Sequence, residues 1–408
     1  MGVRRGEVAH LLLFLLAALL AFQRSSLPDF EERDAYVRGF LVGDLIRDPN
    51  RTTGRIRITE SEVEEVEGRK ALLQVYGYLP PEAKEISFLG KVVVRNNRVF
   101  LYTSGREIDL IASERGVRDL LIDRYRSVSS HREMVPLGLS FLFGEPRELL
   151  PSGVRRDFLH TGLVHLLVVS GLHVGTVALV LSRMLPRFSG MKLSLIGVGL
   201  YTLLLVPKEP PVLRASLMFS LMILSLLTFR RPNALAILLF SGTSVLLVYP
   251  QYVLSYSFWL SFSATAYIIL AVRDLEASLP VKTLIASASA FTGVAPLISI
   301  FSGVSPLSVI LTPLLSPLVL IYSLFGVLSL LTLMSFPPFV DLFNLTGFLF
   351  QKAVKLASHL SFTLYPRIGS FEAVLLTLLG LALLYILRGY FRLIPLAGLN
   401  LWLLLRSV

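Results

Sequence analysis

The hydrophobic and polar positions of this chain follow two patterns, and the change lies near residue 113. From residue 30 to about 112, short stretches alternate polar and apolar positions among dense charges, as half-buried strands do. Beyond this point the apolar residues form long runs. Several of them suit a hydrocarbon core ~30 Å thick, which takes roughly 20 helical residues to cross. The pattern predicts a small β domain followed by a helical membrane domain.

Five alternating stretches predict the strands of the first region, at residues 36–42, 55–58, 71–78, 86–95 and 99–103. The pair Asn96-Asn97 separates the last two and predicts a hairpin turn, because asparagine tolerates the left-handed backbone region. Five short strands within residues 28–113 favour a small barrel, with an OB-like fold as one candidate.

The second region contains eight candidate spans and a final apolar run, at residues 158–185, 191–206, 212–229, 234–249, 252–272, 283–301, 317–335, 371–387 and 391–405. Basic loops alternate with nearly uncharged ones, and the positive-inside rule assigns the basic loops to the cytoplasm. Arg183, Arg230, Arg273 and Arg388 mark these loops. Residues 250–251 and 303–305 are then external. The expected fold is a polytopic α-helical membrane protein with an N-terminal, extracytoplasmic β-barrel.

The apolar run at residues 8–22 follows Arg4 and Arg5. It resembles a signal peptide in length and flanking charge, but no convincing small-x-small cleavage site follows. We interpret residues 1–27 as a retained membrane anchor with a cytoplasmic N-terminus, which puts the barrel outside. Residues 114–157 are expected to form amphipathic or interfacial connecting helices, and residues 158–408 the polytopic channel domain.

Composition supports the membrane assignment. Hydrophobic residues make up 54% of the chain and charged residues only 16%, compared with about 25% charged in soluble proteins. Mean hydropathy is +0.68. The absence of cysteine excludes disulfides, thiolate catalysis and cysteine zinc sites.

The net charge of +11 belongs almost entirely to the membrane region. Residues 30–133 hold 18 basic and 18 acidic residues, whereas residues 134–408 hold 18 basic and 8 acidic ones. This excess fits the positive-inside rule. The alternative interpretation is a polyanion or an anionic membrane lipid as a partner.

The densest polar feature of the membrane region spans residues 160–175, with His160, His165, His173 and the pair Ser170-Gly171. Polar groups in a membrane helix are costly and usually face an interior or a path. The alternative is hydrogen bonding between helices that small residues allow to approach closely. The histidine spacing matches no common zinc pattern, so no metal or cofactor is predicted.

Ser170 with His173 as its base also suggests an intramembrane serine hydrolase. Against this, Val168 stands where the nucleophile motif Gly-x-Ser-x-Gly requires its first glycine. A small-anion secondary transporter is a third alternative. It would contain an internal repeat, and the sequence displays none.

Helix-breaking residues occur inside the apolar runs, namely Gly171, Pro296, Pro306, Pro313 and Pro317. Irregular backbone at membrane depth persists only where protein or water satisfies it. The proline cluster therefore predicts broken or re-entrant helices, as in channels and transporters. A further segment, residues 339–364, places Lys352, Lys355 and His359 on one face, so we expect it to lie flat or to line a wet cavity.

Residues 165–173 read His-Leu-Leu-Val-Val-Ser-Gly-Leu-His and resemble the signature of the ComEC competence proteins, approximately His-Leu-Leu-Ala-Ile-Ser-Gly-Leu-His. The resemblance extends upstream through Gly144-Glu145 and residues 158–162. Three later segments follow in the order of that family, over about 170 residues in all. They are residues 211–218 with Arg214, 257–262 with Ser261 and Phe262, and 295–313 with Pro296, Pro306 and Pro313.

The resemblance implies an inner-membrane channel that passes single-stranded DNA into the cytoplasm during natural transformation, behind an extracytoplasmic OB-like domain. Two positions depart from the family, with Trp259 in place of glutamine and Ser308 near a usual asparagine. The metallo-β-lactamase-like domain of many members, with its His-x-His-x-Asp-His motif, does not occur in the sequence. We therefore expect no enzymatic activity, and a separate nuclease as a possible partner.

Moving a phosphate inward against an inside-negative potential costs about 2.3 kcal/mol per 100 mV. The sequence contains no Gly-x-x-x-x-Gly-Lys-Ser/Thr loop, so the expected partners are a separate cytoplasmic ATP-driven translocase and an extracytoplasmic DNA receptor. Arg214 is the first candidate for a phosphate contact, with snorkelling toward the interface as the alternative. Lys352 and Lys355 are weaker candidates. Tyr76 and Tyr102 are candidate stacking faces for bases, with a place in the barrel core as the alternative.

Overall fold

The computed structural model describes residues 2–25, 30–48, 51–77, 79, 85–95, 98–111, 116–145 and 150–407. The chain divides into two compact units. One holds Met1–Ala21, Val117–Glu145 and Leu150–Val408, and the other holds Phe22–Gly116. The connecting residues after the barrel thus fold with the membrane helices.

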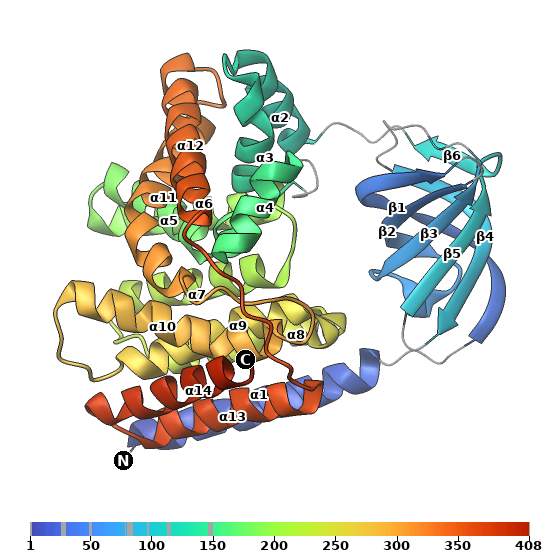
Figure 1. The fold of residues 1–408 in the computed structure, drawn as a ribbon. Coiled ribbons are helices and arrows are strands. Elements are labelled where there is room, and N and C mark those ends of the chain that lie inside the picture. Colours follow the sequence, from blue (N-terminus) through green and yellow to red (C-terminus); the bar gives the residue numbers. More distant parts are fainter. Residues whose placement is uncertain are drawn as a thin grey trace. The chain divides into compact units, whose positions relative to one another are not determined.

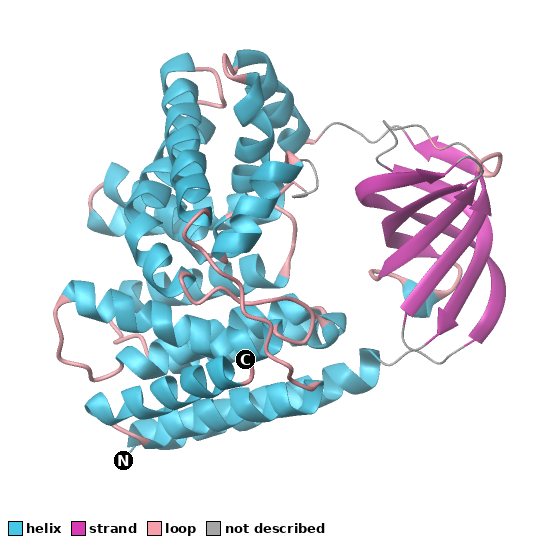
Figure 2. Cartoon of the chain, viewed as in Figure 1, coloured by secondary structure: helices cyan, strands magenta, loops and turns pink. Residues whose placement is uncertain are grey.

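The smaller unit is a β-barrel, drawn in magenta in Figure 2. Five strands close it in the order β1-β2-β3-β5-β4-β1, with β3 parallel to β5. This confirms the small barrel expected from the alternating pattern. The short strand β6 extends the sheet beside β4 and was not expected, and the Asn96-Asn97 turn lies outside the described residues. The strands are β1 (Phe30–Asp48), β2 (Arg51–Ser61), β3 (Lys70–Tyr76), β4 (Glu85–Arg95), β5 (Arg98–Ser104) and β6 (Ile108–Ile111).

The barrel closes because the long strand β1 pairs on both edges. Val37 lies opposite Ser61 of β2 on one side and Phe88 of β4 on the other. The register shifts beside Gly39, where a side-chain Cβ would collide with the carbonyl oxygen of Arg57. Only glycine permits this close approach of two strands at a barrel bend. The interior is filled by alternate aliphatic residues of every strand.

The larger unit is helical (Figure 1). Six segments are long and apolar enough to cross a membrane, and four shorter apolar helices accompany them in the described part of the chain. This confirms a multi-pass membrane protein. The helices are α1 (Gly2–Ser25), α2 (Val117–Val128), α3 (Val135–Phe143), α4 (Ser152–Thr161), α5 (Gly171–Met184), α6 (Arg187–Leu200), α7 (Pro210–Leu227), α8 (Ala234–Val248), α9 (Tyr256–Val272), α10 (Leu279–Ile298), α11 (Ser308–Leu331), α12 (Pro337–Ser358), α13 (Ser370–Ile386) and α14 (Leu393–Leu405).

These helices pack around separate cores. One core joins α2, α3, α4, α11 and α12, and a second joins α1, α8, α9, α13 and α14. A third lies among α5, α6 and α7. In Figure 1 the helices of the second core run across the view, whereas α11, α12 and α2 run up it. Residues 299–307 join α10 to α11, and residues 359–369 join α12 to α13. These two linkers pair through a β-bridge between Val304 and Leu364.

Two expected spans are wrong in their extent. Residues 158–185 do not form one helix, because Gly162 ends α4 in the left-handed conformation and α5 begins only at Gly171. The helix expected from residue 317 begins instead at Ser308 and continues through Pro313 and Pro317. Ser316 explains this tolerance, since its hydroxyl donates to the Pro313 carbonyl that Pro317 cannot serve. The chain breaks between α10 and α11, before these two prolines.

One end of the membrane unit is tied by a buried carboxylate. Glu7 of α1 forms an ion pair with Arg273 at 3.0 Å and accepts a hydrogen bond from Asn233. The hydrogen bond that Arg273 donates to Glu7, together with the negative charge of Glu7, raises the pKa of Arg273. Arg392 donates to the Arg273 backbone carbonyl and lies 3.8 Å from Asp274. The start of α1 and three loops expected to be cytoplasmic therefore meet at one end, which we call the Glu7 end.

Helix α12 packs beside α11 as a 22-residue helix, with Val340, Phe343 and Phe350 in the core. The loop after it returns to Val304, so it reaches the same end as residues 303–305. Lys352 and Lys355 lie on its exposed face.

Candidate functional site

Ser170 and His173 form a capping box at the start of α5. The Ser170 hydroxyl accepts the backbone N–H of His173, and His173 Nδ1 accepts the backbone N–H of Ser170 at 3.1 Å. Histidine thus takes the place that glutamate or glutamine usually occupies in this motif. Both side chains satisfy backbone donors that would otherwise lack partners at a helix start.

The remaining nitrogen of His173, Nε2, is buried and has no hydrogen-bond partner among the residues that the structure describes. The ring packs edge-on against Phe141 of α3, with centroids 4.2 Å apart. Because Nδ1 accepts a backbone N–H, the ring proton belongs on Nε2 and the imidazole is neutral. The signature segment therefore links α5 to the core around α3, α11 and α12.

This geometry does not favour a serine hydrolase. Ser170 Oγ lies 3.4 Å from His173 Nδ1, which already serves the backbone. A catalytic base also needs a third group that orients it, and the described part of the chain provides no such partner for Nε2. The two side chains hold a helix terminus together.

The other histidines lie apart from this box. His165 is exposed, and its Nδ1 lies 3.1 Å from the Gly162 carbonyl. His160 is also exposed on α4. Within the part of the chain that the structure describes, no three metal-ligating side chains come together.

Glycines of the signature region permit close packing, as the alternative interpretation expected. A Cβ on Gly171 would sit 3.7 Å from Ala215, an ordinary contact, whereas one on Gly175 would press on Phe219. Gly162 faces Ser305 and Ser308 of the later proline-rich segment. The signature segment therefore contacts the later proline-rich segment, although the two are far apart in the sequence.

Arg214 and Ser261 are brought together from two separate family segments. Arg214 lies on α7 and is 9% exposed. Its Nε donates to Ser261 Oγ of α9 at 2.9 Å, and Nη1 lies 3.2 Å from Met218 Sδ. Among the described residues, no carboxylate is within ion-pair distance of it.

The sequence around Arg214 explains its unneutralised charge. Between Asp157 and Asp274, Glu209 is the only acidic residue. Buried charges in proteins are normally paired, because desolvation is costly. A buried guanidinium with neutral partners retains donor capacity for an anion, since it has five N–H groups in a fixed fork.

The other residues of these segments pack in the core. Phe262 stacks on Phe14 of α1 with centroids 4.5 Å apart, and Trp259 donates to the Val253 carbonyl. Pro296 is buried within the continuous helix α10. Pro306 lies in the linker before α11, and Pro313 inside that helix.

The barrel places basic and aromatic residues on one outer face. Tyr76 is exposed on β3, and Tyr102 is half-buried on β5. Tyr102 lies opposite Lys91 of β4, and Phe100 follows the same outward alternation. Exposed basic side chains flank these rings, namely Arg55, Lys91, Arg95 and Arg98.

Sequence reasoning missed two polar links that position α2 and α3. Arg118 pairs with Glu145 at 2.7 Å and donates to the carbonyl of Leu205, five residues after the end of α6. Tyr125 donates to Asn344 of α12 at 2.7 Å. Glu145 appeared only as part of a resemblance, and its partner is 27 residues away.

Comparison with known proteins agrees with these segments. The family described as competence protein matches residues 141–391. A protein of Aquifex aeolicus (strain VF5), described as uncharacterized, is 44% identical over 403 residues, which cover 98% of this chain and 97% of that protein. No solved structure matches the chain. The ComEC-like resemblance is thus confirmed: the chain belongs to the competence protein family, and this membership implies a role in DNA uptake.

Proposed function

We propose that this chain is a channel subunit that conducts single-stranded DNA across the bacterial cytoplasmic membrane during natural transformation. The observation that carries the proposal is Arg214, a buried cation in the membrane unit whose partners are neutral. A transient phosphate contact would use its remaining donors without trapping the strand, because conduction requires binding sites weak enough to leave.

The outer face of the barrel supplies a second element for such a path. Rings of β3 and β5 lie beside cations of β4 and β5, with Tyr102 opposite Lys91, as on surfaces that bind single strands by stacking and backbone attraction. In OB folds the outer face of strands 2 and 3 commonly binds oligonucleotides. Tyr76 and Arg55 lie on those two strands. We propose that Tyr76 and Tyr102 stack on bases.

The proposed orientation puts the Glu7 end in the cytoplasm. Basic residues dominate the loops that meet there, as the positive-inside rule requires. In this orientation α1 emerges outside, so the barrel is extracytoplasmic. Because the loop after α12 shares an end with residues 303–305, both are external, and α14 then ends outside.

A channel of this kind provides no free energy to drive the DNA strand inward. Each phosphate entering an inside-negative cell costs about 2.3 kcal/mol per 100 mV. We propose that a cytoplasmic ATP-driven translocase pulls the strand, that an extracytoplasmic receptor delivers it, and that this chain performs no enzymatic step. Any nuclease that degrades the second strand is then a separate protein.

The test is DNA uptake in cells whose transformation depends on this chain, with membrane insertion checked by immunoblotting. Arg214→Ala should reduce transformants by about 100-fold, because a lost buried phosphate contact is worth roughly 3 kcal/mol. Arg214→Lys retains the charge and should retain part of the activity. Normal uptake by Arg214→Ala would reject the proposed role of this residue.

The barrel face is tested separately with the purified full chain. Tyr102→Ala should weaken binding of a single-stranded oligonucleotide by about tenfold, since stacking contributes roughly 1–3 kcal/mol per base. Removing Arg55 and Arg98 should also reduce the salt dependence of binding. Phe88→Leu, a change inside the barrel core, is the control and should leave oligonucleotide affinity unchanged.

A further inference from the structure

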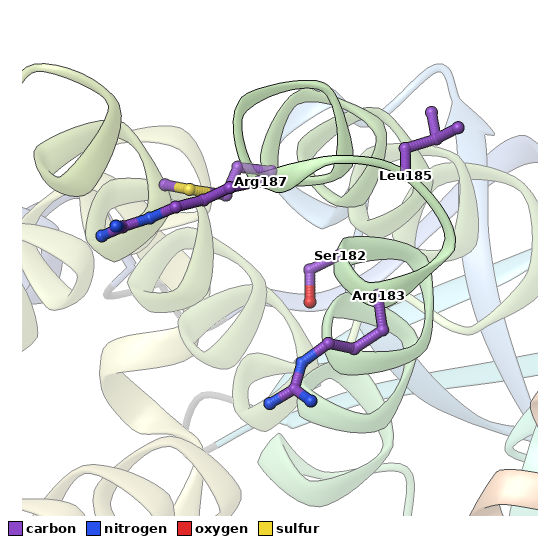
Figure 3. Close-up of a pocket in the computed structure, with 5 residues that line it drawn as sticks. Ser182, Arg183, Leu185 and Arg187 are labelled. Atoms are coloured by element: carbon purple, nitrogen blue, oxygen red, sulfur yellow. The ribbon is translucent and has the colours of Figure 1, made fainter.

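A hollow of about 350 Å³ lies at the turn between α5 and α6. Ser182, Arg183, Leu185, Arg187 and Met191 line it. Figure 3 shows the guanidinium groups of Arg183 and Arg187 extending to the same side of the turn, while Leu185 points away from them. The hollow is remote in sequence from Arg214 and is not part of the site described above.

A glycine makes this turn tight enough to form the hollow. A Cβ on Gly190 would collide with the carbonyl oxygen of Ser182 and would crowd that of Leu185. Without it, the first turn of α6 packs directly on the last turn of α5. The two arginines, four residues apart across the turn, thereby line the same hollow despite their like charge.

Among the residues that the structure describes, neither Arg183 nor Arg187 forms an ion pair with a carboxylate. Residues 158–208 and 210–273 contain neither aspartate nor glutamate. Lys192, Arg230 and Arg231 are further exposed cations in the neighbouring segments. The ring centroids of Phe188 in α6 and Phe229 after α7 are 5.7 Å apart, so the segment with Arg230 and Arg231 lies close to α6. Like charges gathered without counter-ions are unfavourable unless an anion joins them.

Large apolar side chains surround the cations on the surface. Met184, Leu185 and Phe188 are 58%, 47% and 49% exposed, and Phe229 is 84% exposed. Phe229 also adopts a φ of +56°, in the left-handed region where a bulky residue is a genuine outlier. Glycine is the usual residue at such a helix end. A strained, protruding phenylalanine beside arginines suggests contact with an apolar medium.

We propose that the α5–α6 hollow binds the phosphate headgroup of an anionic phospholipid. The arginine forks match phosphate geometry, and the apolar rim formed by Met184, Leu185, Phe188 and Phe229 inserts among the acyl chains. Basic pockets at the cytoplasmic ends of membrane helices are suited to such headgroups. The alternative occupant, an emerging DNA strand, would not require Phe229 to protrude in a strained conformation. The inference does not depend on DNA transport.

The test uses the full chain purified in detergent, with bound phospholipid detected by native mass spectrometry. Phosphatidylglycerol should bind and raise the Tm, and phosphatidylcholine should not. The double variant Arg183→Gln/Arg187→Gln should bind phosphatidylglycerol about 25-fold more weakly, because each cation near an anionic lipid contributes roughly fivefold. Lys282→Gln/Arg388→Gln removes two cations from other loops and should bind as the unaltered chain does.

Phe229→Gly provides a second variant that does not risk misfolding. It relieves the left-handed strain, so the lipid-free Tm should rise while binding of phosphatidylglycerol weakens. Equal binding of the two phospholipids, or unchanged affinity in the arginine double variant, would overturn the proposal. Displacement of phosphatidylglycerol from the unaltered chain by inorganic phosphate alone would also overturn it. So would an arginine double variant that loses binding of a single-stranded oligonucleotide but retains binding of phosphatidylglycerol.

Discussion

Two polar pairs in the membrane unit differ both in how they stand out in the sequence and in what they do in the structure. Ser170 and His173 belong to a conspicuous histidine-rich segment, and Arg214 and Ser261 come from two inconspicuous ones. In the first pair, both side chains bond backbone donors of a single helix start. In the second, a buried cation from α7 is held by a neutral hydroxyl from α9.

The difference lies in what each pair leaves unsatisfied. The capping box uses Nδ1 of His173 and the Ser170 oxygen locally. Only Nε2 of the ring, which packs against Phe141, has no hydrogen-bond partner among the described residues. Arg214 leaves a full charge and several donors without a counter-ion. A polar side chain that satisfies backbone hydrogen-bond donors stabilises the fold, whereas a buried charge that the fold does not neutralise points to a ligand. Density of polar residues is thus a poorer guide to function than their partners.

The largest expected effect separates function from stability at Arg214. In Arg214→Met the uncompensated charge disappears, so thermal unfolding in detergent should reveal equal or greater stability, by up to about 4 kcal/mol. Transformation should nevertheless fall by about 100-fold. A variant that is both less stable and still active would make Arg214 a structural residue like His173.

A smaller effect is expected at Ser261. Ser261→Ala removes the hydroxyl that orients the guanidinium but keeps the charge, so transformation should fall by about tenfold. This matches the roughly 1.5–3 kcal/mol typical of a hydrogen bond to a charged group. Ser263→Ala, two residues further along α9, is the matched control. If both variants behave alike, orientation by Ser261 does not matter.

The next effect concerns the stability of α5. His173→Ala should lower the free energy of unfolding by about 1–2 kcal/mol, because a helix cap and a buried ring contact are both lost. His173→Gln restores the acceptor of the capping box and should recover part of this. Unfolding of the two variants in denaturant gives the comparison. Equal loss in both would argue that Nε2 rather than the cap is important.

The smallest effect is expected at Ser170. Ser170→Ala should cost about 1 kcal/mol of stability and Ser170→Gly only a few tenths, as at other helix N-caps. The unaltered protein should not react with a serine-directed fluorophosphonate. Labelling that vanishes in Ser170→Ala would support the serine hydrolase and would show that Ser170 and His173 have a catalytic rather than a structural role.

Several elements were predictable because they depend on local pattern. The alternation at Arg55 and Ile56 predicted β2, and the run from Ala234 predicted α8 to within one residue of its observed end. The helix through Pro313 and Pro317 was not predictable from proline content. Its continuity depends on a serine hydroxyl that reaches a carbonyl freed by the second proline.

By itself, the sequence determined the membrane class, the barrel, the order of the family segments and the basic bias of the loops, since periodicity and charge are local properties of the chain. Only the tertiary structure decided which polar groups meet. Glu7 reaches Arg273 across 266 residues, and Arg214 reaches Ser261 across 47. Partners so distant are selected by helix packing, and it is the partner that makes one buried polar residue a cap and another an uncompensated charge.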